Sequence, residues 1–163
     1  MKSLLIVYHS RTGGTGQMAR AAAGGARSDG EVAVELVTAE AAGPDDLLAA
    51  DGYIFAAPEN LAAIAGVMKD FFDRSYYPVL GRINGRPFLS LVCAGSDGHN
   101  AVHQIARIAT GWRLRQVADP VIVHTHAQTP DAILAMKVIP SADLERCEEL
   151  GKTFAAGLAM GIF

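Results

Sequence analysis

Short runs of apolar residues alternate along the chain with stretches of helical character. The apolar runs lack a two-residue alternation of apolar and polar positions, which indicates strands that are buried on both faces of a sheet. These runs cover residues 3–8, 32–37, 53–57, 87–94 and 117–123. Strands that alternate with helices in this way are typical of a parallel sheet built from βαβ units. The pattern therefore predicts an α/β protein.

The helical stretches complete a three-layer arrangement. They are expected at about 15–27, 62–76, 100–112 and 142–160, and the sequence Pro-Asp-Asp at 44–46 is expected to open a short helix. Pro58 is expected to end the third strand, and Ser141 is placed to cap the last helix. Short right-handed crossovers leave few topologies for five strands. We expect a five-stranded parallel sheet of order 2-1-3-4-5, with a ligand site beyond the carboxyl ends of the strands.

Composition narrows the class of protein. The 163 residues show no linker or repeat, so we expect one domain over 1–163. The net charge of −3 gives no support for a nucleic-acid partner or for binding to an anionic membrane surface. No apolar stretch is long enough to span a bilayer, and the N-terminal apolar run is too short for a signal peptide. We therefore expect a cytoplasmic protein whose two cysteines are reduced.

The loop after the first strand carries the strongest chemical signal. Its three hydroxyl residues alternate with glycines in the sequence Ser-Arg-Thr-Gly-Gly-Thr-Gly at 10–16. It opens a helix, whose N-terminal N–H groups attract anions, and its glycines allow the backbone to curl around a phosphate. The loop lacks the lysine of a Walker A motif and the spacing of the dinucleotide fingerprint. The sequence therefore predicts a phosphate site that is neither a Walker A loop nor a dinucleotide-binding loop.

The pattern Ser-x-Thr-Gly-x-Thr at 10–15 resembles the FMN-phosphate loop of the flavodoxin family, at the same place after the first strand. This resemblance implies a flavodoxin-like fold and FMN as the cofactor. It implies that Ser10, Thr12, Gly13 and Thr15 contact the phosphate, with Gly14 in the same loop. Arg11 stands at the variable position, where it either adds a charge-assisted bond or points to solvent.

Two further stretches are similar to the flavodoxin-like NAD(P)H-dependent FMN and quinone reductases, namely 51–58 and the Met-Lys-x-Phe-x-Asp-Arg pattern at 68–74. The resemblance implies two loops around the flavin ring. Their candidate residues are Pro58, Glu59, Asn60 and Leu61 in one loop, and Ala94, Gly95, Ser96, Gly98 and His99 in the other. The first loop departs from the family because no aromatic residue follows Pro58 to cover the ring.

Other interpretations of these residues stay open. Glu59 and Asn60 also suit a pair that caps a helix, and His99 also suits an exposed loop position. Met68, Phe71 and Phe72 at helical spacing indicate a core face. His124 and His126 have a spacing that permits a metal pair, but no third ligand is visible nearby, so no metal site is predicted.

The resemblance implies that reduced nicotinamide, as NADPH or NADH, passes a hydride to the flavin, which then reduces a quinone, a free flavin or a similar acceptor. No catalytic side chain is required, because the flavin carries the chemistry. Two alternatives stay open: a non-enzymatic flavodoxin-type electron carrier, and a binding or regulatory protein whose flavin site has decayed. The weak net charge and the missing aromatic argue against the carrier. A homodimer or homotetramer, in which a partner chain completes the open pocket, is a further expectation.

Overall fold

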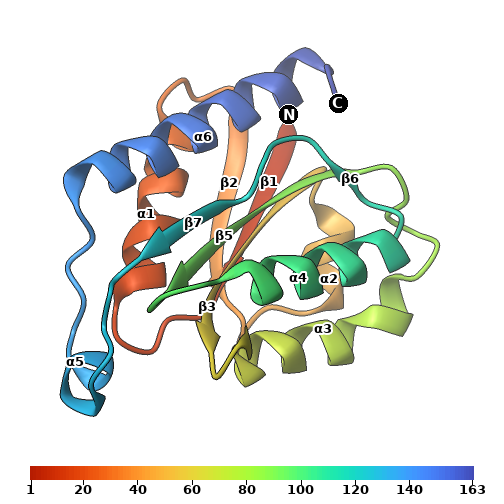
Figure 1. The fold of residues 1–163 in the computed structure, drawn as a ribbon. Coiled ribbons are helices and arrows are strands. Elements are labelled where there is room, and N and C mark those ends of the chain that lie inside the picture. Colours follow the sequence, from red (N-terminus) through yellow and green to blue (C-terminus); the bar gives the residue numbers. More distant parts are fainter.

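The computed structural model describes residues 1–163 and contains one twisted sheet at its centre (Figure 1). Four parallel strands form most of it: β1 (Lys2–Tyr8), β2 (Val32–Thr38), β3 (Gly52–Asn60) and β5 (Pro87–Ala94). The short strands β6 (Arg115–Gln116) and β7 (Val121–His124) both pair with β5, and β4 (Ala63–Ile64) pairs antiparallel with β3. The order β2-β1-β3-β5-β6 confirms the predicted 2-1-3-4-5 arrangement, because β5 is the predicted fourth strand.

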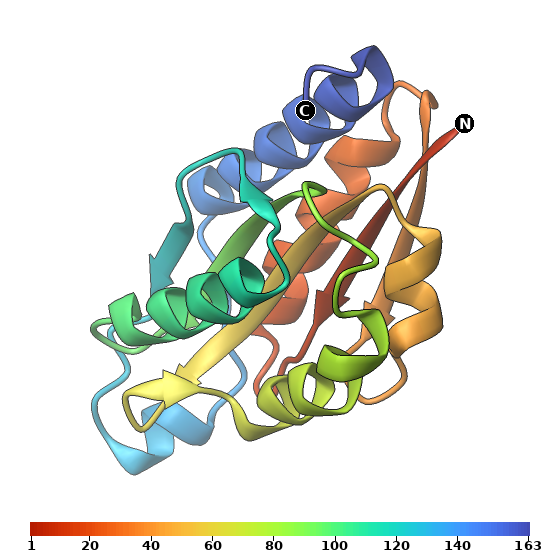
Figure 2. The same ribbon diagram turned by 90° about the vertical axis from the view of Figure 1, so that its right-hand side faces the viewer.

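Helices cover both faces of the sheet (Figures 1 and 2). On one face lie α1 (Gly14–Arg27) and α6 (Ser141–Met160). On the other lie α2 (Pro44–Ala49), α3 (Gly66–Val79) and α4 (His99–Gly111). A short helix, α5 (Pro130–Leu134), lies apart from these layers near the carboxyl ends of the strands. None of the helices is both long enough and apolar enough to cross a membrane.

The two faces of the sheet carry separate apolar cores, which explains the unbroken apolar runs of the strands. In β3, Phe55 faces α3 and α4, whereas Ile54 faces α1 and α6. Phe55 contacts Phe72 and Trp112 with ring centroids 5.1 and 6.4 Å apart. Each large apolar side chain buried here contributes about 1.5–3 kcal/mol to folding. The predicted core residues Met68, Phe71 and Phe72 are buried, as expected.

The third strand does not end at Pro58, which corrects the prediction. β3 continues to Asn60 and returns through β4 as a hairpin, so α3 begins at Gly66 rather than near residue 62. Proline is tolerated there because β1 has already ended opposite Ala56, and position 58 therefore needs no ladder hydrogen bond on that side.

The last third of the chain also departs from prediction. The strand expected over 117–123 is observed only from Val121, as β7, directly after Pro120, which has no N–H to donate. The two-residue strand β6 precedes the expected range. The helix α5 was not expected, although Thr129 caps it and Pro130 opens it. Ser141 is the first residue of α6 and not its cap, which is Pro140.

Candidate functional site

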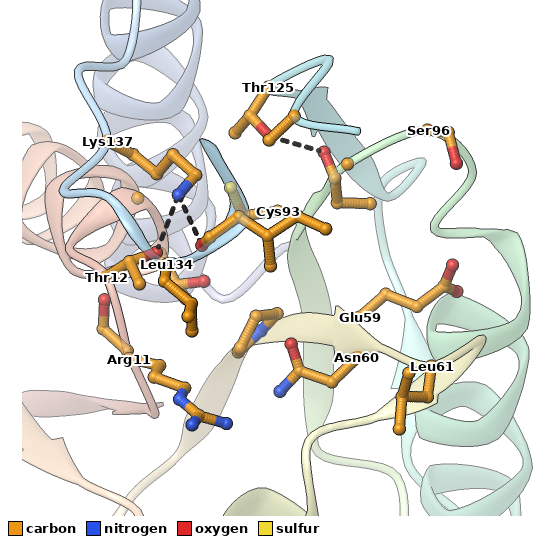
Figure 3. A pocket seen from close by; sticks show the side chains of 18 of the residues that line it. Arg11, Thr12, Glu59, Asn60, Leu61, Cys93, Ser96, Thr125, Leu134 and Lys137 are labelled. Carbon is orange, nitrogen blue, oxygen red and sulfur yellow. Dashed lines mark hydrogen bonds between the residues drawn. The ribbon is translucent and has the colours of Figure 1, made fainter. Parts of the chain in front are cut away.

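A cavity of about 510 Å³ opens at the carboxyl ends of the strands, where the loops after β1, β3 and β5 converge (Figure 3). Its volume lies in the range of small-molecule and cofactor sites. Twelve predicted site residues line it: Ser10, Arg11, Thr12, Gly14, Thr15, Pro58, Glu59, Asn60, Leu61, Ala94, Gly95 and Ser96. The structure therefore brings together three loops that lie far apart in the sequence.

Three of the predicted residues do not line this cavity. Gly13 lines a neighbouring cavity of about 300 Å³, together with Arg20. Gly98 is the residue before α4, with φ of 95°, and supports the third loop from outside the cavity. The His99 side chain is 78% exposed and its Nδ1 forms a hydrogen bond with Asp97 Oδ1 at 2.6 Å. This hydrogen bond lowers the pKa of Asp97.

The first loop has the form of an anion cradle. Gly13 adopts φ of 92° directly before α1, a conformation that glycine reaches without strain. The Gly16 N–H donates to Ser10 Oγ at 3.0 Å, which closes the loop onto itself. A Cβ on Gly14 would lie 2.8 Å from Cys93 Sγ, so a larger residue would not fit without displacing the cysteine. The loop therefore keeps its backbone close to β5.

Thr15 supplies the sharpest indication of a ligand. Its side chain is 2% exposed, lines the cavity, and has an Oγ1 without any hydrogen-bond partner. A buried hydroxyl left unpaired costs about 1–3 kcal/mol, so such groups usually have a partner. Thr15 lies in the first turn of α1, where free N–H groups favour an anion. The orphaned hydroxyl and the glycine cradle together fit a phosphate group.

The second loop is the β3–β4 hairpin. Its Glu59 carboxylate accepts hydrogen bonds from the backbone N–H groups of Gly98 at 2.8 Å and Ala101 at 3.0 Å. Glu59 therefore caps α4, which agrees with the capping interpretation for this residue. Asn60 is exposed at the cavity and points into it (Figure 3). Leu61, at the tip of the hairpin, is fully exposed.

Sequence reasoning missed the fourth side of the cavity. It consists of the loop after β7 and the segment around α5, and its members are Thr125, Ala127, Gln128, Ile133, Leu134 and Lys137. The loop after β7 also leaves the carboxyl edge of the sheet, so the topology that predicted the other loops applied to it as well. Ala62 and Cys93 complete the lining.

Cys93 shapes the wall of the cavity without offering a nucleophile. Its side chain is buried, and this burial raises the pKa of the thiol to about 11, although Lys137 opposes the shift. The thiol is therefore protonated near neutral pH, whereas a thiolate would be the reactive form.

His124 Nε2 forms a hydrogen bond with the Asp97 carbonyl oxygen at 2.6 Å, which occupies that ring nitrogen.

The sequence is similar to those of two kinds of known protein. A flavodoxin of Aquifex aeolicus is 28% identical over 98% of this chain and 89% of its own length. An NAD(P)H dehydrogenase (quinone) of Acidithiobacillus ferrooxidans is 34% identical over 46% of this chain and 48% of its own length.

The fold has close structural relatives. The crystal structure of the flavodoxin, WrbA-like protein from Agrobacterium tumefaciens superposes with a TM-score of 0.77 and 23% identity, covering 99% of both chains. This likeness confirms the flavodoxin-like fold. The family model of NADPH-dependent FMN reductases matches residues 43–129, just over half of the chain, including the second and third loops of the cavity. The chain therefore belongs to the NADPH-dependent FMN reductase family.

Proposed function

We propose that residues 1–163 act as one FMN-binding domain with NAD(P)H-dependent oxidoreductase activity toward a quinone, a free flavin or a similar small acceptor. The observation that carries the proposal is the buried, unpartnered Thr15 hydroxyl at the start of α1, in a cavity of flavin size. Membership of the reductase family supports NADPH or NADH as the electron donor.

The residues of the cavity divide into two groups under this proposal. Ser10, Thr12 and Thr15 would hold the phosphate through their hydroxyls, together with the free N–H groups of the first turn of α1. The ring would lie between the β3–β4 hairpin and the segment 94–96, with the apolar side chains of Ile133 and Leu134 nearby. Bound FMN would supply the redox chemistry, which is the uptake of a hydride and the transfer of its electrons to the acceptor. The protein contributes orientation and a partly apolar surrounding.

The open side of the cavity determines which kinds of electron acceptor can reach the flavin ring. No aromatic residue covers the β3–β4 side, where Asn60 and Leu61 are both exposed. Both the nicotinamide and the acceptor need access to the ring, and the missing aromatic leaves room for them. Small planar acceptors suit such an opening better than a protein partner, because the weak net charge of −3 provides little electrostatic steering.

An electron carrier is the second candidate, and one observation favours it. The Aquifex aeolicus protein that matches 98% of this chain is named flavodoxin. A carrier would bind FMN in the same cavity but would not accept electrons directly from NADPH or NADH. Flavin binding alone therefore does not separate the two candidates.

The first test is a titration of the protein with FMN, followed by flavin fluorescence, and then anaerobic addition of NADPH or NADH. We expect saturable binding and loss of the flavin absorbance near 450 nm (about the usual wavelength of oxidised flavin). Binding without bleaching would favour the carrier. Absence of binding would reject both candidates and favour a decayed site.

A variant pair tests the phosphate end of the site. Thr15→Val removes the hydroxyl and keeps the shape of the side chain, so we expect FMN affinity to fall about 10- to 100-fold. Ser75 on α3 carries the other buried and unpartnered hydroxyl and does not line the cavity. Ser75→Ala should leave FMN affinity unchanged. Equal FMN affinity of Thr15→Val and Ser75→Ala would show that the Thr15 hydroxyl does not bind the phosphate.

We also propose that a second copy of the chain covers part of the cavity mouth, as a homodimer or homotetramer. Apolar side chains are exposed at this rim, with Leu61 fully accessible and Leu134 63% accessible. Light scattering in the presence of FMN tests the proposal. A monomer with full FMN affinity would refute it.

A further inference from the structure

Lys137 is a cationic residue of the cavity that no sequence motif predicted. It lies between α5 and α6, and its side chain lines the cavity beside the loop of residues 10–16, named the phosphate loop from here on (Figure 3). The backbone around it is fixed to that loop. The Lys137 N–H donates to the Thr12 carbonyl oxygen at 2.8 Å, and the Lys137 carbonyl oxygen accepts from Gln17 Nε2 at 2.7 Å. The position of this residue is therefore tied to the loop itself.

The Lys137 ammonium group has only neutral partners. Its Nζ donates to Thr12 Oγ1 at 3.3 Å, to the carbonyl oxygen of Ile133 at 2.8 Å and to that of Ala135. None of the ion pairs in the structure includes Lys137. Its positive charge is therefore oriented by hydrogen bonds but not neutralised by a carboxylate.

The other charged residues of the cavity do not take this place. Arg11 lines the cavity but is exposed and makes no hydrogen bond or ion pair that would fix its guanidinium group. The Glu59 carboxylate is engaged by the backbone N–H groups of Gly98 and Ala101. Lys137 is thus the cation that the structure holds against a hydroxyl of the phosphate loop.

The contact with Thr12 has a consequence for that hydroxyl. A threonine hydroxyl has one proton to donate and accepts through its oxygen. Because Thr12 Oγ1 accepts from Lys137, its own proton is free to be donated to another acceptor. An anion in the loop would therefore meet an oriented hydroxyl and a nearby positive charge, and charge-assisted bonds of this kind are the stronger ones.

We propose that Lys137 is the counter-charge of the FMN phosphate and makes the site select phosphorylated flavin over riboflavin. The inference rests on the proposed function, because it assumes that FMN occupies this cavity. The role of counter-charge differs from a purely structural role, in which the Lys137 ammonium would only bind the carbonyl groups at the end of α5.

The test compares FMN with riboflavin, which lacks the phosphate, in wild-type protein and three variants. We expect Lys137→Met to lower FMN affinity about 10- to 100-fold and to leave riboflavin affinity within about twofold. Lys137→Arg should retain most of the preference for FMN. Lys152→Met on α6, whose Nζ is 3.9 Å from Asp29, is the matched control and should change neither affinity.

Each outcome decides for or against the proposal. An equal loss of affinity for both flavins in Lys137→Met would assign a structural role only, and no loss would overturn the proposal. If the wild-type protein binds neither flavin, the proposed function fails, and inorganic phosphate becomes the probe. In that case the selection of FMN is rejected too, and a rise in the melting temperature of wild-type protein with phosphate, absent in Lys137→Met, would keep Lys137 only as the counter-charge of a phosphate that is not on a flavin, whereas equal rises or none would reject that role as well.

Discussion

The carboxylate of Glu59 and the backbone N–H of Ala101 are joined by a hydrogen bond of 3.0 Å, which ties the β3–β4 hairpin to the first turn of α4. The second carboxylate oxygen of Glu59 accepts from the Gly98 N–H at 2.8 Å. Gly98, directly before α4, has no side chain with which to cap the helix. A distant acidic residue therefore satisfies the free N–H groups of the helix, and its charge suits the positive end of the helix dipole.

Removal of this cap should weaken the fold. We expect Glu59→Ala to lower the free energy of unfolding by about 1–2 kcal/mol, because it leaves the N–H groups of Gly98, directly before α4, and of Ala101, in its first turn, without their acceptor. Urea unfolding followed by circular dichroism measures the change. Glu31→Ala is the control, since Glu31 is exposed in the turn before β2 and makes no side-chain hydrogen bond or ion pair. Equal stability of the two variants would contradict the capping role.

Glu59 also shows what local sequence patterns can and cannot predict. Its position after Pro58 permitted two interpretations, a helix cap or a residue at the flavin ring. The helix it caps begins about forty residues later, and no spacing within the loop could identify that partner. By contrast, the four long strands β1, β2, β3 and β5 and their order followed from apolar runs and helical stretches, because buried parallel strands carry a signal within each segment.

The fourth side of the cavity shows the same limit. Thr129 and Pro130 are a local signal for the start of a helix, and they do open α5. Nothing near Lys137 in the sequence indicates that its ammonium reaches Thr12, because that contact depends on how the segment after β7 folds back over the phosphate loop. Contacts between distant segments are set by packing of the whole chain.

The hairpin turn itself carries backbone strain. Leu61 and Ala62 adopt φ of 51° and 61°, a left-handed conformation that a two-residue hairpin turn of this type requires and that asparagine and glycine adopt more easily. We expect the double variant Leu61→Asn, Ala62→Gly to raise the free energy of unfolding by about 1–2 kcal/mol. Ala63→Gly in β4 is the control and should lower it by about 0.5–1 kcal/mol. Urea unfolding midpoints compare the variants, and a destabilised double variant would count against strain at the turn.

Two neighbouring glycines of α1 should respond to alanine in opposite directions. A Cβ on Gly25 would overlap the Glu148 carbonyl oxygen of α6, whereas a Cβ on Gly24 would meet nothing within 4 Å. We expect Gly25→Ala to destabilise the protein by about 3 kcal/mol, because the two helices would have to move apart. Gly24→Ala should stabilise it by about 0.5–1 kcal/mol through helix propensity. Thermal melting of both variants tests the close approach, and a neutral Gly25→Ala would show that α6 can shift without cost.

The two buried thiols should make the fold sensitive to alkaline pH. Burial raises the pKa of Cys93 and of Cys147 from an ordinary value of 9.0 to about 11 in each case. A raised pKa means that the folded state favours the protonated thiol, so this stability is complete below about pH 9 and is lost as pH rises to about 11. Two pKa units correspond to about 2–3 kcal/mol for each thiol.

Unfolding by urea under reducing conditions, repeated at several pH values, measures this loss. The double variant Cys93→Ala, Cys147→Ala should be less stable at neutral pH, because it loses buried side-chain volume, but should show a shallower decline between pH 9 and 11. Tyr53 stays in both proteins, and burial raises its pKa to about 12, so a common decline from about pH 10 upward is expected. If wild-type protein and the double variant decline in parallel from pH 9, the thiols are not the groups responsible, because only their removal separates the two profiles.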